Sequence, residues 1–279
     1  MRKGLGATAL LLALLVVGGC ETSDLMPTPV EVLPSVTPQR LRLAYPDALE
    51  PLVRAWISAY QRTSPAVEIV ALERADPLAW QALERGDVDM VMGSWRPTSV
   101  PTGTWRTPLV RDGLAVALNP QNGLPGLTIV QLRELFQGRV TDWEMWEGLP
   151  GTPVLITRGD TTGDARFFRR QVMGDLPVAL TAVVAPNTEA VLQFVGERPL
   201  AVGYLSTARL DERVRAVPVE GIPPTQEVLE SGVYPLTRDF QVVTLGEPQG
   251  AVRDFVQWLL SPQGQSIVAT RGWVPLAGR

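Results

Sequence analysis

The pattern of apolar and polar positions divides the first half of the chain into alternating strands and helices. Residues 40–45, RLRLAY, alternate charged and apolar side chains, as a strand with one buried face does. The next residues, PDALEPLVRAWISAY, place their apolar side chains on one stripe of a helix, with Asp47 as the expected cap. A strand at 67–73, a helix opened by Asp76 and a strand at 87–94 follow. This order predicts a parallel sheet layered with helices.

A second block of the same kind begins after residue 115. Thr128 is expected to cap a helix, LTIVQLRELFQG, that ends at Gly138. Further on, the pattern predicts strands in TPVLIT, LTAVVAP and LAVGYLS, and helices in ARFFRRQVM and, capped by Asn187, NTEAVLQFVGE. The chain closes with two helices, the second starting at Ser261 with a proline in its first turn. The sequence therefore predicts two α/β blocks.

The N-terminus has the organisation of a secretory signal. MRKG precedes the apolar run ATALLLALLVV, which ends in small residues and is shorter than the roughly 20 residues of a membrane span. VVGGC resembles the lipobox of bacterial lipoproteins, which implies a signal peptide over residues 1–20 and lipidation of Cys20, the only cysteine. Residues 21–39 are rich in proline, serine and threonine and are expected to be a flexible tether. The alternative is a transmembrane anchor.

Composition excludes several classes of function. The 279 residues suffice for two domains, and the net charge of −4 without basic clusters gives no footprint for nucleic acid. There is no histidine, and Lys3 is the one lysine, so nucleophiles that need a histidine or lysine base are excluded from the mature chain. Zinc sites of histidine and cysteine are excluded as well. We expect no cofactor and no metal, although calcium or magnesium sites made of carboxylates alone stay compatible with this composition.

One stretch, VLITRGDTTGDARFF, carries candidate chemistry. It predicts a buried strand ending at Thr157, a glycine-containing turn, and a helix starting near Asp164. Ligands of α/β sheets bind beyond the carboxyl ends of the strands, where helix N-termini favour anions. Arg158 can pair with an oxyanion, and Thr162 and Gly163 can add hydroxyl and backbone donors, as can the hydroxyl of Thr161. The alternative is an ordinary turn and helix cap with Arg158 in a surface ion pair.

The same stretch resembles the phosphate-binding loop of the substrate-binding proteins of phosphate ABC transporters. In that family an arginine is followed by Ser-Gly-Thr and an aromatic residue, and here Arg158 is followed by Thr162, Gly163, Asp164 and two phenylalanines. Four other segments between residues 128 and 276 are similar to the family in the same order. They are LTIVQLRELFQGRVTDWEMW, AVGYLSTARL, YPLTRDFQVVT and FVQWLLSPQGQSIVATRGWVPL.

The resemblance implies an α/β, two-lobed periplasmic-binding-protein-like (type II) fold with a cleft between the lobes. It implies a first lobe of residues 40–114 plus 242–279 and a second lobe of residues 115–241, with the chain crossing near RDGLAVALNP and YPLTRDFQVV. It also implies that Arg158, Thr162, Gly163, Asp164, Ser94 and Trp95 lie at the ligand site, and the hydroxyl of Thr161 in the same turn completes the expected ligand-binding set.

The chain departs from the family pattern in the first lobe. After the first strand it has Tyr45, Pro46 and Asp47 instead of a hydroxyl-rich loop, and proline lacks an N–H donor. Asp76 replaces hydroxyl residues after the second strand, and Trp95 stands where an aspartate that accepts the anion's proton is expected. In the second lobe Asp164 replaces a threonine. A carboxylate beside a bound dianion costs free energy unless one of them carries a proton. Trp95 and Arg96 are an alternative wall for another oxyanion or an organic ligand.

Three functions fit these features. The first is a lipid-anchored, extracytoplasmic solute-binding protein of an ABC importer, a monomer that presents phosphate or a related oxyanion to permease subunits. The second is a sensor or structural lipoprotein of the same fold with an altered or lost ligand site. The third is a hydrolase that pairs the carboxylates of Asp160 and Asp164, although no spacing separates such a pair from turn residues.

Overall fold

A computed structural model describes residues 39–94 and 102–276. They belong to one compact unit, Thr37–Arg279. Cys20 and residues 21–38 of the expected tether, together with Trp95 and Arg96, lie outside the described residues, whereas Gln39, also expected in the tether, is the first residue of a strand. Within the described ranges no helix has the length and apolarity that a membrane crossing requires.

The strands follow the predicted order, although several are shorter than expected. For example, only Val183–Ala185 of the expected strand LTAVVAP is a strand in the structure. The strands are β1 (Gln39–Tyr45), β2 (Val67–Glu73), β3 (Met90–Gly93), β4 (Thr104–Leu118), β5 (Val154–Arg158), β6 (Val183–Ala185), β7 (Ala201–Ser206), β8 (Arg215–Val217), β9 (Thr237–Leu245) and β10 (Val274–Pro275).

Eight α-helices are described in these ranges, with short 3-10 segments Asp47–Leu49, Trp143–Trp146 and Thr207–Arg209 and a π-helical segment Arg169–Met173 after α4. The helices are α1 (Glu50–Thr63), α2 (Asp76–Glu84), α3 (Ile129–Phe136), α4 (Gly163–Phe168), α5 (Thr188–Glu197), α6 (Gln226–Ser231), α7 (Gly250–Leu260) and α8 (Pro262–Thr270).

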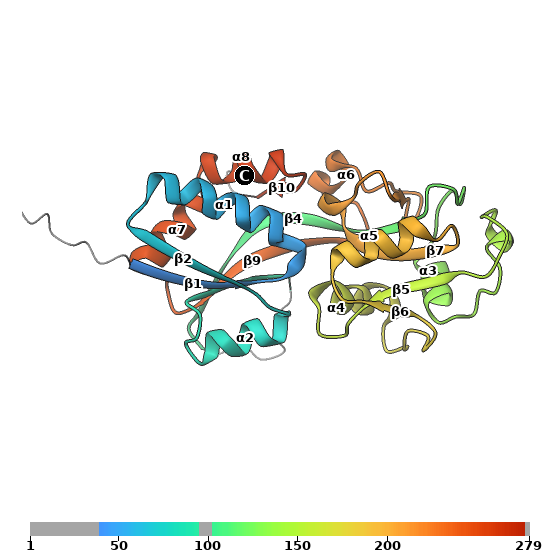
Figure 1. The fold of residues 1–279 in the computed structure, drawn as a ribbon, viewed down its shortest axis with the longest axis horizontal. Helices are drawn as coiled ribbons and strands as arrows, with labels where there is room; N and C mark the ends of the chain where they lie inside the picture. Colours follow the sequence, from blue (N-terminus) through green and yellow to red (C-terminus); the bar gives the residue numbers. More distant parts are fainter. Residues whose placement is uncertain (1–38, 95–101, 277–279) are drawn as a thin grey trace, which may run out of the picture. The chain divides into compact units, whose positions relative to one another are not determined.

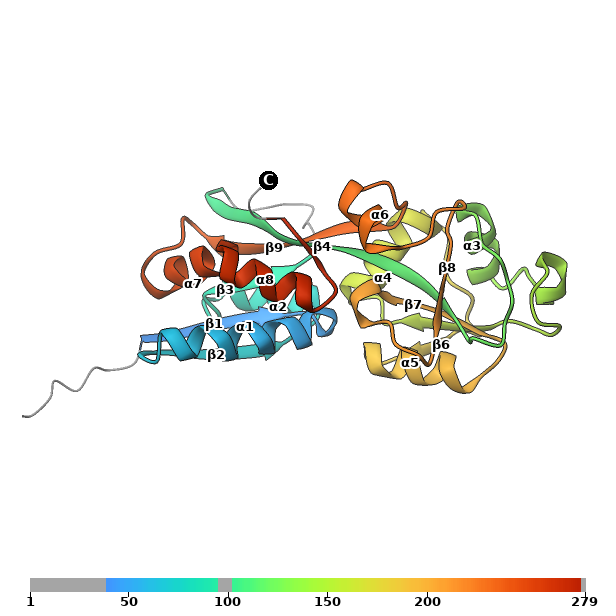
Figure 2. The ribbon, with the colours of Figure 1, turned by 90° about the horizontal axis from the view of Figure 1, so that it is seen from above.

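The strands pair in the order β2-β1-β3-β9-β4-β7-β5-β6, with β8 and β10 also on β4. β1 is parallel to β2 and β3, whereas β9 is antiparallel to β3 and β4. Thr104–Gly113 of β4 pairs with β9, and Leu114–Leu118 pairs with β7. β4 therefore runs from one group of elements into the other (Figures 1 and 2). We call β1–β3, α1, α2, α7 and α8 the first lobe, and β5–β8 with α3–α6 the second lobe.

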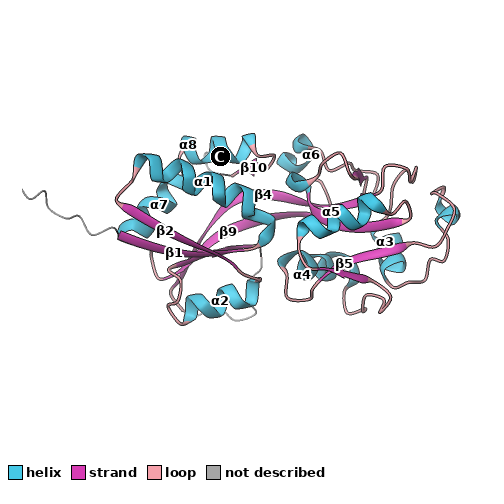
Figure 3. Cartoon of the chain, in the orientation of Figure 1, coloured by secondary structure: helices cyan, strands magenta, loops and turns pink. Residues whose placement is uncertain are grey.

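The first lobe buries side chains on both faces of its sheet. Leu41 and Leu43 of β1 lie in a core cluster with Trp56 of α1 and Phe255 of α7, whereas Ala44 lies in a separate cluster with residues of α2. Alternate residues of a strand point to opposite faces, so one strand serves both clusters. Figure 3 accordingly shows α1 and α8 on one side of this sheet and α2 on the other.

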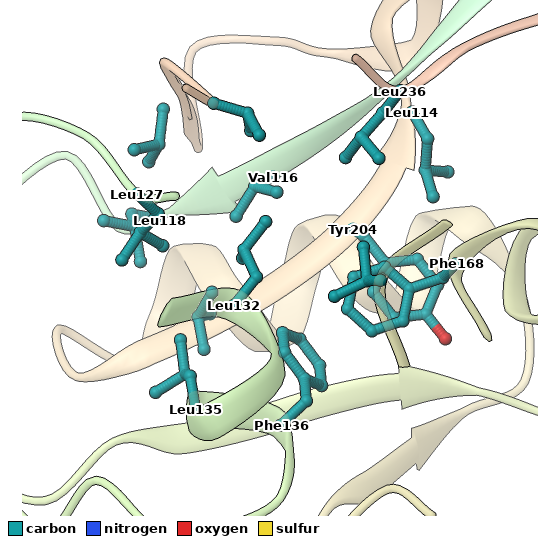
Figure 4. Close-up of a cluster of buried hydrophobic side chains, with 14 of the residues drawn as sticks. Leu114, Val116, Leu118, Leu127, Leu132, Leu135, Phe136, Phe168, Tyr204 and Leu236 are labelled. Atoms are coloured by element: carbon teal, nitrogen blue, oxygen red, sulfur yellow. The ribbon is translucent and has the colours of Figure 1, made fainter. Parts of the chain in front are cut away.

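The core of the second lobe is centred on the last part of β4. Leu114, Val116 and Leu118 face Leu132 and Phe136 of α3 in one buried cluster (Figure 4). Because Leu132, Leu135 and Phe136 are spaced three and four residues apart, they share one face of α3, as the pattern predicted. Phe168 stacks on Tyr204 at the edge of this cluster, with ring centroids 4.2 Å apart. This cluster anchors the elements that carry the candidate site.

The caps of the second half are confirmed. The Thr128 hydroxyl accepts a hydrogen bond from the Gln131 backbone N–H in a capping box, Asn187 caps α5 and Ser261 caps α8. Gly138 has φ of 73° just beyond α3, in the left-handed region that glycine tolerates. The two caps expected in the first half are wrong. Neither Asp47 nor Asp76 makes a side-chain hydrogen bond to the N-terminus of its helix.

Candidate functional site

Arg158 is the last residue of β5 and is buried, with its side chain 1% exposed. Its backbone N–H donates to the Tyr204 hydroxyl at 3.2 Å, and the same hydroxyl contacts the Thr157 hydroxyl at 2.8 Å. Burial raises the pKa of Tyr204 to about 12, so the phenol is neutral in the physiological range. The end of β5 is thus fixed by β7, and the guanidinium extends from a rigid position.

The Arg158 guanidinium contacts groups of both lobes. Nη2 lies 3.0 Å from Oδ2 of Asp47, and Nη1 donates to the Thr188 hydroxyl at 3.2 Å and lies 3.7 Å from Oδ2 of Asp164. Nη2 is also 3.4 Å from the carbonyl oxygen of Pro186, whereas the buried Nε has no hydrogen-bond partner among the described residues. The alternative of a surface ion pair for Arg158 is wrong, because the guanidinium is buried between carboxylates.

Asp47 crosses from the first lobe to the second instead of capping its own helix. One carboxylate oxygen, Oδ2, accepts hydrogen bonds from the Thr188 backbone N–H at 2.9 Å and the Thr188 hydroxyl at 2.8 Å. Thr188 is the first residue of α5, so the carboxylate lies at the positive end of that helix. The cap failed because the α5 terminus and Arg158 together offer stronger donors than the 3-10 turn that follows Asp47.

A second buried arginine lies on the crossing strand β9. Arg238 donates from Nη1 to Oδ1 of Asp164 at 2.6 Å, and from Nη2 to Oδ2 of Asp112 at 2.8 Å. Asp112 is opposite Arg238 in the β4–β9 register and also accepts from the hydroxyls of Ser206 and Thr207. Burial raises the pKa of Asp112, with Arg238 opposing that shift. Burial alone would lower the pKa of Arg238, but Asp164 and Asp112 raise it above its ordinary value.

Asp76 approaches the binding-loop residue Gly163 from the first lobe. A Cβ added to Gly163 would lie 2.8 Å from Oδ2 of Asp76 and 3.3 Å from Oγ of Ser94, so a larger residue there would require the Asp76 side chain to shift. Asp76 is 4% exposed, and its Oδ2 has no hydrogen-bond partner among the described residues. Burial, and secondly the charge of Asp164, raise its pKa to about 7. At neutral pH this carboxyl is therefore partly protonated.

Acidic and basic side chains are crowded around Arg158. The carboxylates of Asp47, Asp76, Asp112 and Asp164 share this region with the guanidinium groups of Arg158 and Arg238. Arg166 and Arg209 add positive charge beside Asp76 and Asp47. A bound dianion would bring further negative charge to these carboxylates, so protonation of Asp76 favours its binding.

The structure distributes the other predicted ligand residues unevenly. Thr161 is exposed, and the Thr162 hydroxyl is engaged in capping α4, accepting from Ala165 N–H at 3.2 Å and donating to the Gly159 carbonyl at 2.9 Å. Ser94 lies beside Gly163 at the end of β3. Trp95 lies outside the described residues.

Sequence reasoning missed three residues of this site. Thr188 was expected only as part of a helix, while Asp112 and Arg238 lay unremarked in the two segments expected to cross between lobes. The sequence offered only a weak signal for the last pair, because each crossing segment contains an adjacent arginine and aspartate. These are Arg111 and Asp112 in β4 and Arg238 and Asp239 in β9.

A cavity of about 410 Å³ borders the same network on the side of β9. Asp239 and Gln241 of β9 line it together with α4 and π-segment residues. The lining residues are Ser94, Phe167, Arg170, Gln171, Thr237, Arg238, Asp239 and Gln241.

The two lobes, the crossing strands and the site between them define a type II periplasmic-binding-protein fold, a class of two-lobed α/β proteins. The chain belongs to the PBP superfamily: the model of the PBP superfamily domain matches residues 34–263. This is a family of binding proteins, in line with the expectation of no catalytic activity, and the resemblance to phosphate-transporter binding proteins is confirmed.

The hydrolase alternative is wrong. Asp160 is exposed and pairs with Arg169 at 3.0 Å, whereas Asp164 is buried and pairs with Arg238. The two carboxylates therefore belong to separate ion pairs, and the family to which the chain belongs is one of binding proteins.

Individual relatives show the extent of the similarity. The chain is 28% identical to the phosphate-binding protein PstS of Bacillus subtilis over 167 residues, 59% of this chain and 55% of the relative. It is 24% identical to PstS of Pseudomonas aeruginosa over 271 residues, 84% of this chain and 82% of the relative. The match thus spans only about half of the Bacillus protein. An ABC-type phosphate transport receptor of Vibrio cholerae superposes with a TM-score of 0.75 at 22% identity, covering 85% of this chain and 100% of the receptor.

Proposed function

We propose that this protein is a lipid-anchored, extracytoplasmic solute-binding protein of an ABC importer that binds phosphate or a related oxyanion between its lobes. Cys20 carries the lipid, residues 21–38 form the tether, and permease subunits receive the solute from a monomeric protein. The lobe boundaries are those expected from the sequence, 40–114 with 242–279 and 115–241. The similarity to PstS proteins supports the ligand class.

The observation that carries this proposal is the donor set at Arg158. A buried guanidinium, the Thr188 hydroxyl and the backbone N–H at the start of α5 converge on one anionic oxygen. Converging charged and backbone donors at a helix N-terminus are the usual recognition elements for a small oxyanion. In the present structure that oxygen belongs to Asp47, which means that the donors are already arranged around negative charge.

Thermal unfolding in the presence of oxyanions tests the proposal. The chain from residue 21 onward, which retains the whole compact unit, is heated with and without millimolar phosphate, sulfate, tungstate or molybdate. Binding to the folded state raises the midpoint in proportion to the logarithm of ligand excess. We expect the shift with phosphate to be lost in Arg158→Lys, because lysine keeps the charge but lacks the planar fork of donors of the guanidinium group.

Arg42→Lys is the matched control. Arg42 also pairs with an aspartate, Asp89, at 2.6 Å, but both residues belong to the first lobe and the pair does not reach the second. This variant should keep the full phosphate shift. If no oxyanion raises the midpoint of the unsubstituted chain or of a variant with a less acidic cleft, the oxyanion assignment is wrong.

The aspartates around Arg158 favour one second candidate, a sensor or structural lipoprotein in which the ligand site is altered or lost. Asp47, Asp76 and Asp164 occupy the region that the relatives of this family are expected to leave to the anion. The thermal measurement separates the candidates, because a protein without a ligand gains no stability from any of the four oxyanions.

A further inference from the structure

The contact between Asp47 and the second lobe has the form of a bound ligand. Oδ2 of Asp47 accepts hydrogen bonds from the Thr188 N–H at 2.9 Å and the Thr188 hydroxyl at 2.8 Å, and it forms an ion pair with Arg158 Nη2 at 3.0 Å. All three partner groups belong to the second lobe, whereas Asp47 follows β1 of the first lobe. The carboxylate of Asp47 therefore connects the first lobe to Arg158 and Thr188 of the second lobe.

Contacts other than those with Asp47 also hold Arg158 and Thr188 in position. Arg158 is fixed through Tyr204 and is almost fully buried, and its Nε lies without a partner among the described residues. Thr188 begins α5, a helix of ten residues whose side-chain cap is Asn187, with Oδ1 of Asn187 accepting from the Ala190 N–H. These groups are donors placed for an anion, and an external oxyanion would need the same atoms that Asp47 now occupies.

We propose that Asp47 is an internal ligand: its carboxylate occupies the oxyanion position, holds the two lobes together without solute and competes with any solute anion for Arg158 and Thr188. This inference rests on the proposed function insofar as it names the competitor. It adds that the affinity and specificity of the site are set by an aspartate that belongs to the protein itself.

Two further contacts between the lobes reinforce the same arrangement. Arg209, which follows β7, donates to the backbone carbonyl of Asp47 at 3.0 Å, and Asp76 lies against Gly163. Arg209 therefore fixes the backbone of the residue whose side chain enters the site. The carboxylate of Asp47 is 17% exposed, so it can leave the site toward water without carrying a fully buried charge through the protein core.

Competition by Asp47 raises the apparent dissociation constant for phosphate by an amount that can be measured. When only a fraction of molecules has a vacant site, the apparent dissociation constant rises by the inverse of that fraction. If Asp47 occupies the oxyanion position in nine molecules of ten, the apparent affinity for phosphate falls roughly tenfold. Removal of the charge also removes direct repulsion of a dianion, so the gain in affinity on substitution is expected to be roughly tenfold or more.

The experiment compares the chain from residue 21 with Asp47→Asn, Asp47→Ser and, as the control, Asp89→Asn. Asp89→Asn removes an equal charge from the first lobe, where Asp89 pairs with Arg42 at 2.6 Å. Calorimetric titration with inorganic phosphate gives the affinities. Small-angle X-ray scattering without phosphate gives the radius of gyration of each protein.

We expect both Asp47 variants to bind phosphate roughly tenfold tighter or more than the unsubstituted chain, with Asp89→Asn unchanged. We also expect their radius of gyration without phosphate to be larger, because the lobes separate. If the unsubstituted chain binds phosphate and the Asp47 variants bind it no tighter, the internal-ligand inference is overturned while the proposed function stands.

If no protein binds phosphate, the assignment of phosphate as the solute fails, and the scattering alone decides the inference. An increase in the radius of gyration confined to the Asp47 variants would still support closure by Asp47. Equal radii for all four proteins would overturn it.

Discussion

At the scale of single residues, the protein combines buried acids that differ in their hydrogen-bond partners. Asp76 has no hydrogen-bond partner for Oδ2 among the described residues, whereas Asp112 accepts from Arg238 and two hydroxyls. Burial without a partner favours the neutral acid, so the pKa of Asp76 rises from 3.8 to about 7. Protonation there removes one negative charge beside Gly163 and Asp164, which favours an anion in the site.

The Asp76 carboxyl makes folding stability depend on pH. Because its pKa is higher in the folded than in the unfolded chain, folding takes up a proton between these two values. Its contribution to stability is therefore present below about pH 4 and is lost as pH rises toward 7. Asp76→Asn should abolish this dependence, so that the free energy of unfolding of the variant relative to the parent increases by about 2–3 kcal/mol from pH 5 to pH 8.

Urea unfolding of both proteins at the two pH values measures that difference. Asp89→Asn, on the same lobe, should show no comparable change with pH. A constant difference between Asp76→Asn and the parent would show that Asp76 is ionised throughout the range and would contradict the assignment of a raised pKa.

At the scale of elements, the two crossing strands are held by a buried ion pair. Asp112 of β4 and Arg238 of β9 face each other in register and are fully and almost fully buried. Arg238→Met leaves the carboxylates of Asp112 and Asp164 without their cation and should lower the free energy of unfolding by about 3–5 kcal/mol. Adding Asp112→Asn should recover part of this loss, since one uncompensated charge is then removed.

Denaturant titration of these variants provides the measurement, with Arg169→Met as the control. Arg169 pairs with Asp160 at 3.0 Å on the surface, so its removal should cost less than about 1 kcal/mol. An Arg238→Met variant as stable as Arg169→Met would mean that the crossing strands do not depend on this pair.

Helix ends were predictable from the local sequence where the capping side chain bonds to N–H groups of the same helix. Thr128, Asn187 and Ser261 cap helices as expected, because their hydroxyl or amide oxygens lie next to the N–H groups they accept from. Asp47 and Asp76 also stand at the start of helices. Asp47 instead accepts a hydrogen bond from Thr188 of the second lobe, and Asp76 packs against Gly163 of that lobe. Their partners are more than 80 residues away in sequence, so no local pattern contains them.

At the scale of the whole described chain, the order of strands and helices and the resemblance in five segments gave the two-lobed fold. They also gave Arg158 and Gly163 as members of the site. They did not show that an aspartate of the protein occupies the anion donors of the site. That contact depends on how the aspartates of the first lobe are placed relative to the donors of the second lobe. The departures at Asp47, Asp76 and Asp164 were visible in the sequence, but only the fold shows that Asp47 reaches the start of α5 and the guanidinium of Arg158.

The central claim, that the lobes close on Asp47 without solute, is tested most directly by the distance between the lobes. Because the only cysteine is Cys20, the chain from residue 21 can carry spin labels on Glu84→Cys of α2 and Glu197→Cys of α5, both exposed. Pulsed electron–electron double resonance then gives the distribution of distances between the two spin labels in phosphate-free buffer. We predict one narrow distribution for the labelled parent and a broader, longer one after Asp47→Asn. A broad, open distribution in the parent, unchanged by Asp47→Asn, would contradict the account.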